Sequence, residues 1–87
     1  MSARLRVLGR TWCHLCDDLL DRLMALAVSA DVHIDVDDVD ASAALEARWG
    51  EWVPVLLDAD GSALCHYHLD EVVVRAYLAR FPLESAD

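Results

Sequence analysis

The sequence predicts an α/β domain in which a small mixed sheet carries helices on both faces, and three observations support this prediction. A short apolar strand, an amphipathic helix and an alternating strand follow one another within about 33 residues, the length of one right-handed βαβ unit. Asp60-Gly61 between two further apolar runs indicates a β-hairpin. A last apolar segment ending at Pro82 completes the order βαβ, short helix, hairpin, helix.

The first three elements form the βαβ unit. Residues 4–9 alternate arginine with apolar residues, which is typical of a strand, and Gly9 ends it. From residue 13 to about residue 28, apolar side chains share one helical face and acidic side chains the other. Residues 32–37 alternate Val and Ile with His and Asp, which predicts an edge strand with one solvent-facing side.

A short helix and the hairpin follow. We expect Asp40 to cap a helix that runs to Trp49, because Gly50 then supplies a C-terminal stop. The two hairpin strands are expected at residues 54–58 and 63–67, on either side of the turn.

The last helix is expected over residues 70–81, because Pro82 cannot continue it. Residues 83–87 are expected to form a disordered tail. With no repeat, low-complexity tract or linker, residues 1–87 are predicted to form a single domain.

Length and charge limit the classes of function. Sixteen acidic residues against seven basic ones give a formal net charge of −9, which repels nucleic-acid phosphates and anionic membrane surfaces. No apolar run approaches the ~20 residues of a membrane span, and the first residues lack the pattern of a signal peptide. We therefore expect an acidic, cytoplasmic monomer that binds neither nucleic acid nor membrane.

Cys13 and Cys16 lie where the first strand gives way to the first helix. A thiol at a helix start faces unpaired backbone N–H groups and the positive end of the helix dipole, and both favour the thiolate. The second thiol, three positions on, lies on the same side of that turn and can close a disulfide. Because the cytosol keeps ordinary thiols reduced, the pair indicates a redox-active centre.

Two segments carry a resemblance to a known family. The run Cys13-His14-Leu15-Cys16-Asp17, with Trp52-Val53-Pro54-Val55-Leu56 further on, resembles the small bacterial glutaredoxin-like proteins of the thioredoxin-like superfamily. The likeness covers about residues 5–81 and implies a four-stranded sheet of order 4-3-1-2 with the third strand antiparallel. It also implies a thiol-disulfide oxidoreductase of cell redox homeostasis, with Cys13 as nucleophile and Cys16 as resolving thiol. No bound cofactor is expected, and glutathione is the expected reductant.

The resemblance also implies substrate contacts around the cysteine pair. Pro54 is expected to follow a cis peptide bond, and the backbone of Val53 to pair with the bound thiol substrate. Arg10, three positions before the first cysteine, is expected to meet a glutathione carboxylate. Trp12 and His14 flank that cysteine and complete the expected substrate-binding set. The expected partner is a disulfide-containing protein or a glutathione mixed disulfide.

Other hypotheses stay open. Cys65 is either an accessory redox thiol or a plain buried thiol, and His66 and His68 belong either to the substrate rim or to a solvated loop. As an alternative, the paired cysteines with Cys65 and one of these histidines supply four ligands of the types that zinc favours. An iron-sulfur cluster bridging a dimer is a variant of that idea. A third hypothesis is a non-catalytic thioredoxin-like adaptor that binds a partner through its acidic face.

Overall fold

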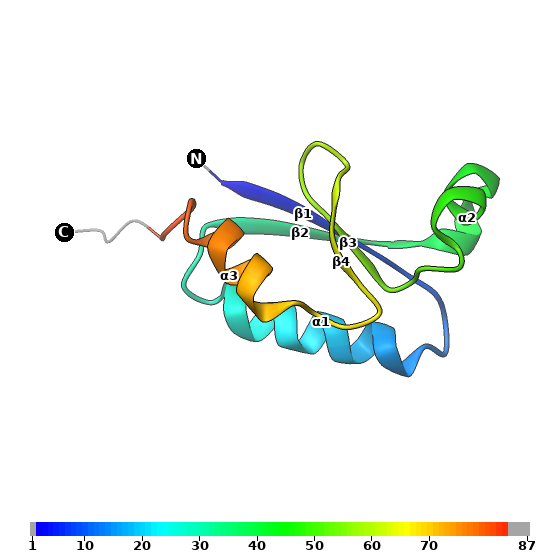
Figure 1. The fold of residues 1–87 in the computed structure, drawn as a ribbon, viewed down its shortest axis with the longest axis horizontal. Helices are drawn as coiled ribbons and strands as arrows, with labels where there is room; N and C mark the ends of the chain where they lie inside the picture. Colours follow the sequence, from blue (N-terminus) through cyan, green and yellow to red (C-terminus); the bar gives the residue numbers. More distant parts are fainter. Residues whose placement is uncertain (1, 84–87) are drawn as a thin grey trace.

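The computed structural model describes residues 2–83 and contains the predicted elements in the predicted order. They are β1 (Ala3–Gly9), α1 (His14–Ala27), β2 (Val32–Asp38), the 3₁₀ helix η1 (Val39–Ala41), α2 (Ala43–Trp49), β3 (Val55–Leu57), β4 (Ala63–His66) and α3 (Glu71–Leu78). Figure 1 shows α1 and α3 together below the sheet and α2 at one end. From residue 84 on, the predicted tail lies outside the described residues.

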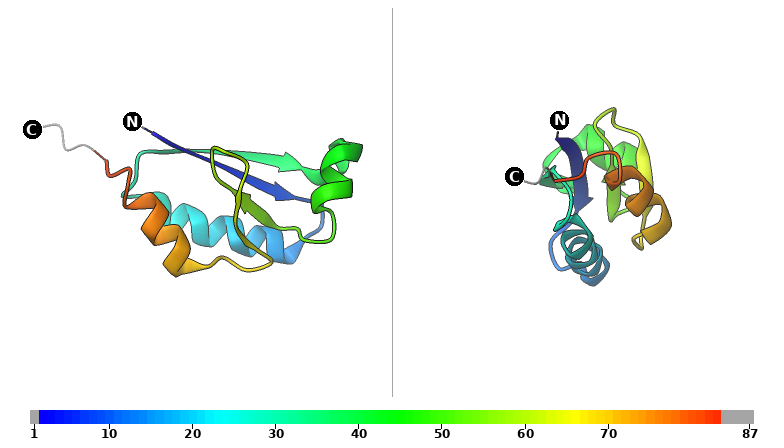
Figure 2. Two further views of the ribbon diagram at one scale, coloured as in Figure 1. Left: turned by 45° about the horizontal axis from the view of Figure 1, so that its top comes forward. Right: turned by 90° about the vertical axis from the view of Figure 1, so that its left-hand side faces the viewer.

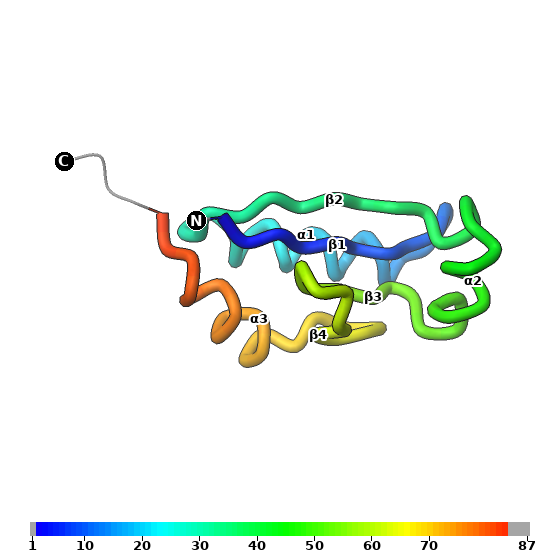
Figure 3. The backbone as a smooth tube through the Cα atoms, turned by 90° about the horizontal axis from the view of Figure 1, so that it is seen from above, coloured from blue at the N-terminus to red at the C-terminus, as the bar shows by residue number. Residues whose placement is uncertain are grey.

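The four strands form one sheet in the order β2-β1-β3-β4, as the family resemblance implies. β1 and β2 are parallel, whereas β3 runs antiparallel to both of its neighbours. Seen from above, the backbone trace shows the strands side by side in this order (Figure 3). Leu8 pairs with Val55 and Val55 with His66, so the end of β1, the start of β3 and the end of β4 meet at one edge.

Helices cover both faces of the sheet, as predicted, because the side chains of β1 alternate. Leu5 and Val7 face α1 and α3, while Leu8 faces α2. The larger core cluster consists of Leu5, Val7, Leu19, Leu23, Ala30, Leu56, Val74 and Leu78. The smaller one consists of Leu8, Val55 and Leu57, against which Leu45 and Trp49 of α2 pack. In the left view of Figure 2, α1 and α3 lie below the sheet, and α2 lies at its right-hand end.

Ion pairs occupy the part of the sheet that α2 leaves open. Arg4 pairs with Asp35 (3.5 Å), and the guanidinium of Arg6 donates to the carboxylate of Asp37. These pairs link β1 to the edge strand β2 on its solvent-facing side, where such contacts contribute little stability individually. They account for the arginines that alternate with apolar residues in the first strand.

The short helix differs from the prediction. Ser42, not Asp40, caps α2, and the N–H of Leu45 donates to the Ser42 hydroxyl (3.3 Å). Asp40 instead belongs to η1, where its N–H donates to the carboxylate of Asp38 (2.8 Å). The expected helix over residues 40–49 is therefore split, because the extended backbone of Ser42 interrupts it.

The short helix ends at Trp49 with Gly50 as its C-cap, as predicted, but the conformation of the glycine is not the one a left-handed stop has. Gly50 keeps right-handed helical angles (φ −55°, ψ −35°), and a Cβ there would collide with Glu46. Its role is therefore close packing against the preceding turn and not a left-handed stop.

The last helix ends three residues before its predicted limit. Beyond Leu78 the backbone hydrogen bonds change to the 3₁₀ type, since the N–H of Phe81 donates to the carbonyl of Leu78, three residues earlier (2.9 Å). The chain then leaves the helix, because the Phe81 carbonyl accepts from Asp31 (2.7 Å) and Pro82 forms a bridge with Ala30. The N–H of Leu83 donates to Ser29 (3.3 Å).

The hairpin turn has the predicted position, and its strands are slightly shorter than expected. The carboxylate of Asp58 accepts from the N–H groups of Asp60 (2.9 Å) and Ser62 (3.0 Å), so the third strand ends at Leu57. Gly61 has a φ of +83°, a conformation that glycine adopts without a steric penalty. Asp58 is thus the side chain that holds the turn.

Replacing Asp58 with Ala should lower the free energy of unfolding by about 1–2 kcal/mol, because two backbone N–H groups lose their acceptor. Asp60→Ala removes the same charge two positions away and is the matched control, expected to change stability by less than about 0.5 kcal/mol. Urea unfolding of the three proteins measures both values. Equal losses in the two variants would show that charge, and not the turn bonds, matters.

Candidate redox site

Cys13 and Cys16 form the centre of the candidate site. Cys13 is the N-cap of α1, and a disulfide joins it to Cys16, with the two Cα atoms 5.2 Å apart. The backbone N–H of Cys16 donates to the Cys13 sulfur (3.1 Å). Cys13 is half-buried, whereas Cys16 is only 8% exposed. The outer sulfur is therefore the one that a large partner can reach.

Gly9 lies against the inner cysteine. A Cβ on Gly9 would stand 3.3 Å from the Cys16 sulfur and 3.4 Å from its Cβ, tighter than ordinary van der Waals contact. The last residue of β1 therefore lets the first turn of α1 approach the sheet. The sequence pattern indicated Gly9 only as the end of a strand. Its position shortly before a cysteine pair is the signal that could have indicated close packing there.

The backbone before β3 lies at the sheet edge where β1 ends, because Val55 pairs with Leu8. The peptide bond between Val53 and Pro54 is cis, as the resemblance implies. Pro54 is buried, and its carbonyl accepts from the N–H of Tyr67 (2.8 Å). Among residues 2–83, the backbone N–H and C=O of Val53 make no hydrogen bond. Two backbone groups thus remain unpaired at the edge where β1 ends.

A cluster of three rings, Trp52, His66 and Tyr67, borders the same edge, and we call it the aromatic rim. Ring centroids lie 5.2 Å apart for Trp52 and His66, 4.7 Å for His66 and Tyr67, and 6.1 Å for Trp52 and Tyr67. The Tyr67 hydroxyl donates to the carbonyl of Glu51 (2.8 Å). His66 stayed open between the substrate rim and a solvated loop, and its packing against Trp52 is an association that the sequence did not predict.

Trp12 stands beside Cys13 with 97% of its surface exposed. It and Tyr67 are the two non-glycine residues with positive φ, at 61° and 62°, within the part of the chain that the structure describes. Such angles are uncommon for bulky side chains and concentrate at functional sites. His14, on the other side of Cys13, is also exposed.

Arg10 is bound to the neighbouring helix. Its guanidinium donates to the carboxylate of Asp40 (2.7 Å) and to the carbonyl of Gly50 (2.7 Å), with Glu46 3.8 Å away. The residue expected to meet a glutathione carboxylate therefore already has partners from α2 and η1. A substrate carboxylate would have to compete with them.

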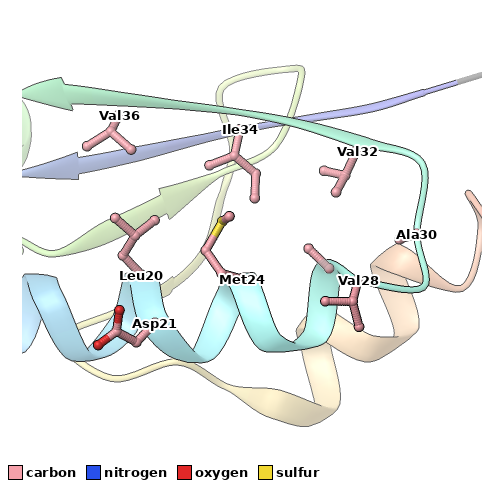
Figure 4. A pocket seen from close by; sticks show the side chains of 9 residues that line it. Leu20, Asp21, Met24, Val28, Ala30, Val32, Ile34 and Val36 are labelled. Carbon is pink, nitrogen blue, oxygen red and sulfur yellow. The ribbon is translucent and has the colours of Figure 1, made fainter.

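A cavity of about 290 Å³ adjoins the inner cysteine. Among its lining residues are Arg10, Thr11, Cys16, Asp17, Asp37 and Asp38. A larger groove of about 570 Å³ lies between α1 and β2 and shares Leu20 and Val36 with this cavity. Figure 4 shows Leu20, Met24 and Ile34 pointing into the groove. That groove is apolar apart from Asp21 and contains no cysteine, so of the two it is the smaller cavity that adjoins the cysteine pair.

Cys65 lies on β4 opposite Leu56 and packs against the larger core cluster. Burial is the main cause that raises the pKa of its thiol above the ordinary value of 9.0. A hydrogen bond from the Asp70 backbone lowers this pKa, and the Asp70 charge raises it. Cys65 is therefore a thiol and not a thiolate at neutral pH.

The ligands of the zinc hypothesis are not gathered into a site. Within residues 2–83, no three His, Cys, Asp or Glu side chains form a group that could hold a metal ion. His68 is exposed, and its backbone N–H donates to the His66 carbonyl (2.7 Å).

A cysteine pair at the start of the first helix, a cis-proline just before the adjacent strand and this sheet order together define a thioredoxin-like fold. The sequence profile of the glutaredoxin-like domain family (DUF836) matches residues 4–79. The chain therefore belongs to the glutaredoxin-like domain family. None of the curated proteins is significantly similar to it.

Solved structures agree with this assignment. The solution NMR structure of protein Ne2328 from Nitrosomonas europaea is 35% identical and superimposes with a TM-score of 0.79, covering 87% of this chain and 91% of that one. The X-ray structure of protein XcR50 from X. campestris is 33% identical with a TM-score of 0.70, covering 90% and 99% respectively. The helices in residues 2–83 are all too short or too polar to cross a membrane.

The contact between Gly9 and Cys16 should appear as an energetic coupling. Gly9→Ala crowds the Cys16 sulfur, so it should destabilise the reduced protein by about 1 kcal/mol more in the wild-type background than in Cys16→Ala. Urea unfolding of the four proteins of this double-mutant cycle, under reducing conditions, measures the difference. Additive effects would contradict the contact.

Burial should make Cys65 slow to alkylate. In a Cys13→Ser, Cys16→Ser background, iodoacetamide should react with Cys65 more slowly than with the urea-unfolded chain at pH 8, since less thiolate is present. The rate should reach its midpoint above pH 9.0. Because the folded pKa is raised, stability should fall as the pH rises through this range. A midpoint below 9.0 would contradict the burial argument.

Proposed function

We propose that this protein is a thiol-disulfide oxidoreductase that exchanges disulfides through Cys13 and Cys16 and serves cell redox homeostasis. The proposal rests mainly on the unequal exposure of the two cysteine sulfurs. Cys13 is accessible at a helix start and accepts the Cys16 N–H (3.1 Å), while Cys16 is buried directly behind it. Membership of the glutaredoxin-like family supports the same activity.

The helix start prepares Cys13 as the nucleophile. In the reduced protein, the N–H groups of the first turn and the helix dipole favour the thiolate at this position. The Cys13 thiolate attacks one sulfur of a substrate disulfide and forms a mixed disulfide. The substrate S–S bond breaks, and its second sulfur leaves as a thiolate that takes up a proton.

Cys16 completes the exchange. Its thiol loses a proton and attacks the Cys13 sulfur, which forms the Cys13–Cys16 disulfide and releases the other substrate sulfur as a thiol. Two electrons have then passed from the protein to the substrate. A thiol reductant, for which glutathione is our proposal, returns them when two of its molecules are oxidised to one disulfide. A cytoplasmic location would supply that reductant.

Single substitutions should separate the two cysteines. We expect Cys13→Ser to lose turnover of a protein disulfide by at least ~100-fold, and Cys16→Ser to accumulate the mixed disulfide at Cys13, visible by intact mass after acid quenching. Cys65→Ser is the matched control and should retain turnover. Undiminished turnover in Cys13→Ser would overturn the proposal.

The redox equilibrium gives an independent measure. In a series of glutathione buffers, the intact mass should fall by the mass of two hydrogen atoms, removed as two protons and two electrons, at a potential of roughly −200 to −270 mV, between those of glutaredoxins and thioredoxin. A dithiol that stays reduced throughout would favour the non-catalytic adaptor instead.

A further inference from the structure

The aromatic rim is built as a surface, not as part of the core. Trp52 is 45% exposed and Tyr67 38% exposed, and neither belongs to the core clusters. His66 packs edge to face on both Trp52 and Tyr67. Two hydrogen bonds hold Tyr67, one from its backbone N–H to the Pro54 carbonyl and one from its hydroxyl to the Glu51 carbonyl. A rigid, partly exposed aromatic cluster loses little entropy when a partner covers it.

The aromatic rim lies at the same edge of the sheet as the redox centre. Trp52 immediately precedes the Val53–Pro54 bond, and His66 pairs with Val55 at the edge where β1 ends. Trp12, almost fully exposed, adjoins Cys13 in the loop that follows the same strand. Aromatic side chains therefore adjoin Cys13 in one segment and the cis-proline in the other. A ligand that contacts both segments must be larger than a disulfide alone.

The charges at this edge favour a cationic ligand. All seven basic residues of the chain are arginines. Within residues 2–83, five of them form ion pairs and the other two lie over aromatic rings, namely Arg4, Arg6, Arg10, Arg22 and Arg75, then Arg48 and Arg80. Asp17, after Cys16, and Glu51, before Trp52, are exposed carboxylates at the site. A substrate with acidic groups would find these carboxylates and few uncommitted donors.

We propose that the aromatic rim docks the polypeptide segment that carries the substrate disulfide, and that this segment is positively charged. The inference rests on the proposed function and names its substrate class: a disulfide in a basic polypeptide, preferred over the anionic glutathione disulfide. Arginine and lysine side chains fit the site for two reasons. The carboxylates attract their charge, and the aromatic faces offer a surface on which they pack. The exchange at Cys13 and Cys16 is the one described above.

The test compares the reaction of four disulfides with the reduced protein by stopped flow. Two are synthetic peptides of one length with a single intramolecular disulfide, flanked by Lys in one and by Glu in the other. The third is hydroxyethyl disulfide, a small neutral probe too short to span the rim. Glutathione disulfide is run alongside.

We expect the Lys peptide to react at least ~10-fold faster than the Glu peptide and than glutathione disulfide at low salt, with the advantage shrinking as NaCl is added. Trp52→Ala should lower the rate ratio of Lys peptide to hydroxyethyl disulfide about 10-fold. Trp52→Phe should restore much of that ratio, because it keeps a ring. Val28→Ala, an exposed position at the far end of α1, is the control and should leave the ratio unchanged.

The outcomes separate the two proposals. No reaction with any disulfide would overturn the proposed function itself. Reaction with hydroxyethyl disulfide, combined with a ratio that Trp52→Ala leaves unchanged, would overturn only the docking role of the rim. His66→Ala supplies a second variant should Trp52→Ala fail to fold, and it should lower the same ratio. A Glu peptide or glutathione disulfide that reacts as fast as the Lys peptide would overturn the charge preference.

Discussion

The antiparallel pairing of Leu8 with Val55 is the constraint on which the rest of the site depends. It sets the end of β1 beside the start of β3, and the pairing of Val55 with His66 adds the end of β4. Residues more than forty positions apart in the chain thereby share one edge. Without this register, the cysteine pair and the cis-proline would not lie at one edge of the sheet, because the local conformation of neither segment brings the two together.

Close packing then gives the two sulfurs different exposure. Gly9 lets the first turn of α1 approach the sheet, which buries Cys16 and leaves Cys13 at the surface as the helix cap. The same helix start supplies the N–H groups that favour a thiolate. Burial of one sulfur and electrostatic support of the other thus follow from one geometric feature, the close crossing of β1 and α1.

Electrostatics and aromatic packing define what surrounds that pair. Arg10 joins the loop before the cysteines to α2 and η1, so its charge contributes to the fold. The aromatic rim, by contrast, is held rigid and left partly exposed. An exposed carboxylate precedes the rim at Glu51 and another follows the cysteines at Asp17. This combination of partly exposed rings and negative charge is the basis for proposing a basic polypeptide as the substrate.

The sequence by itself determined the order of the elements, the hairpin at Asp60-Gly61 and the place of the cysteine pair, because periodicity, turn chemistry and helix starts are local properties. The family resemblance added the sheet order and the cis-proline. Only the tertiary structure decided the partners of Arg10 and the gathering of Trp52 with His66 and Tyr67, since those contacts join distant parts of the chain. The choice of Ser42 over Asp40 as helix cap is local, but neighbouring capping residues compete, and the chain path around them selects one.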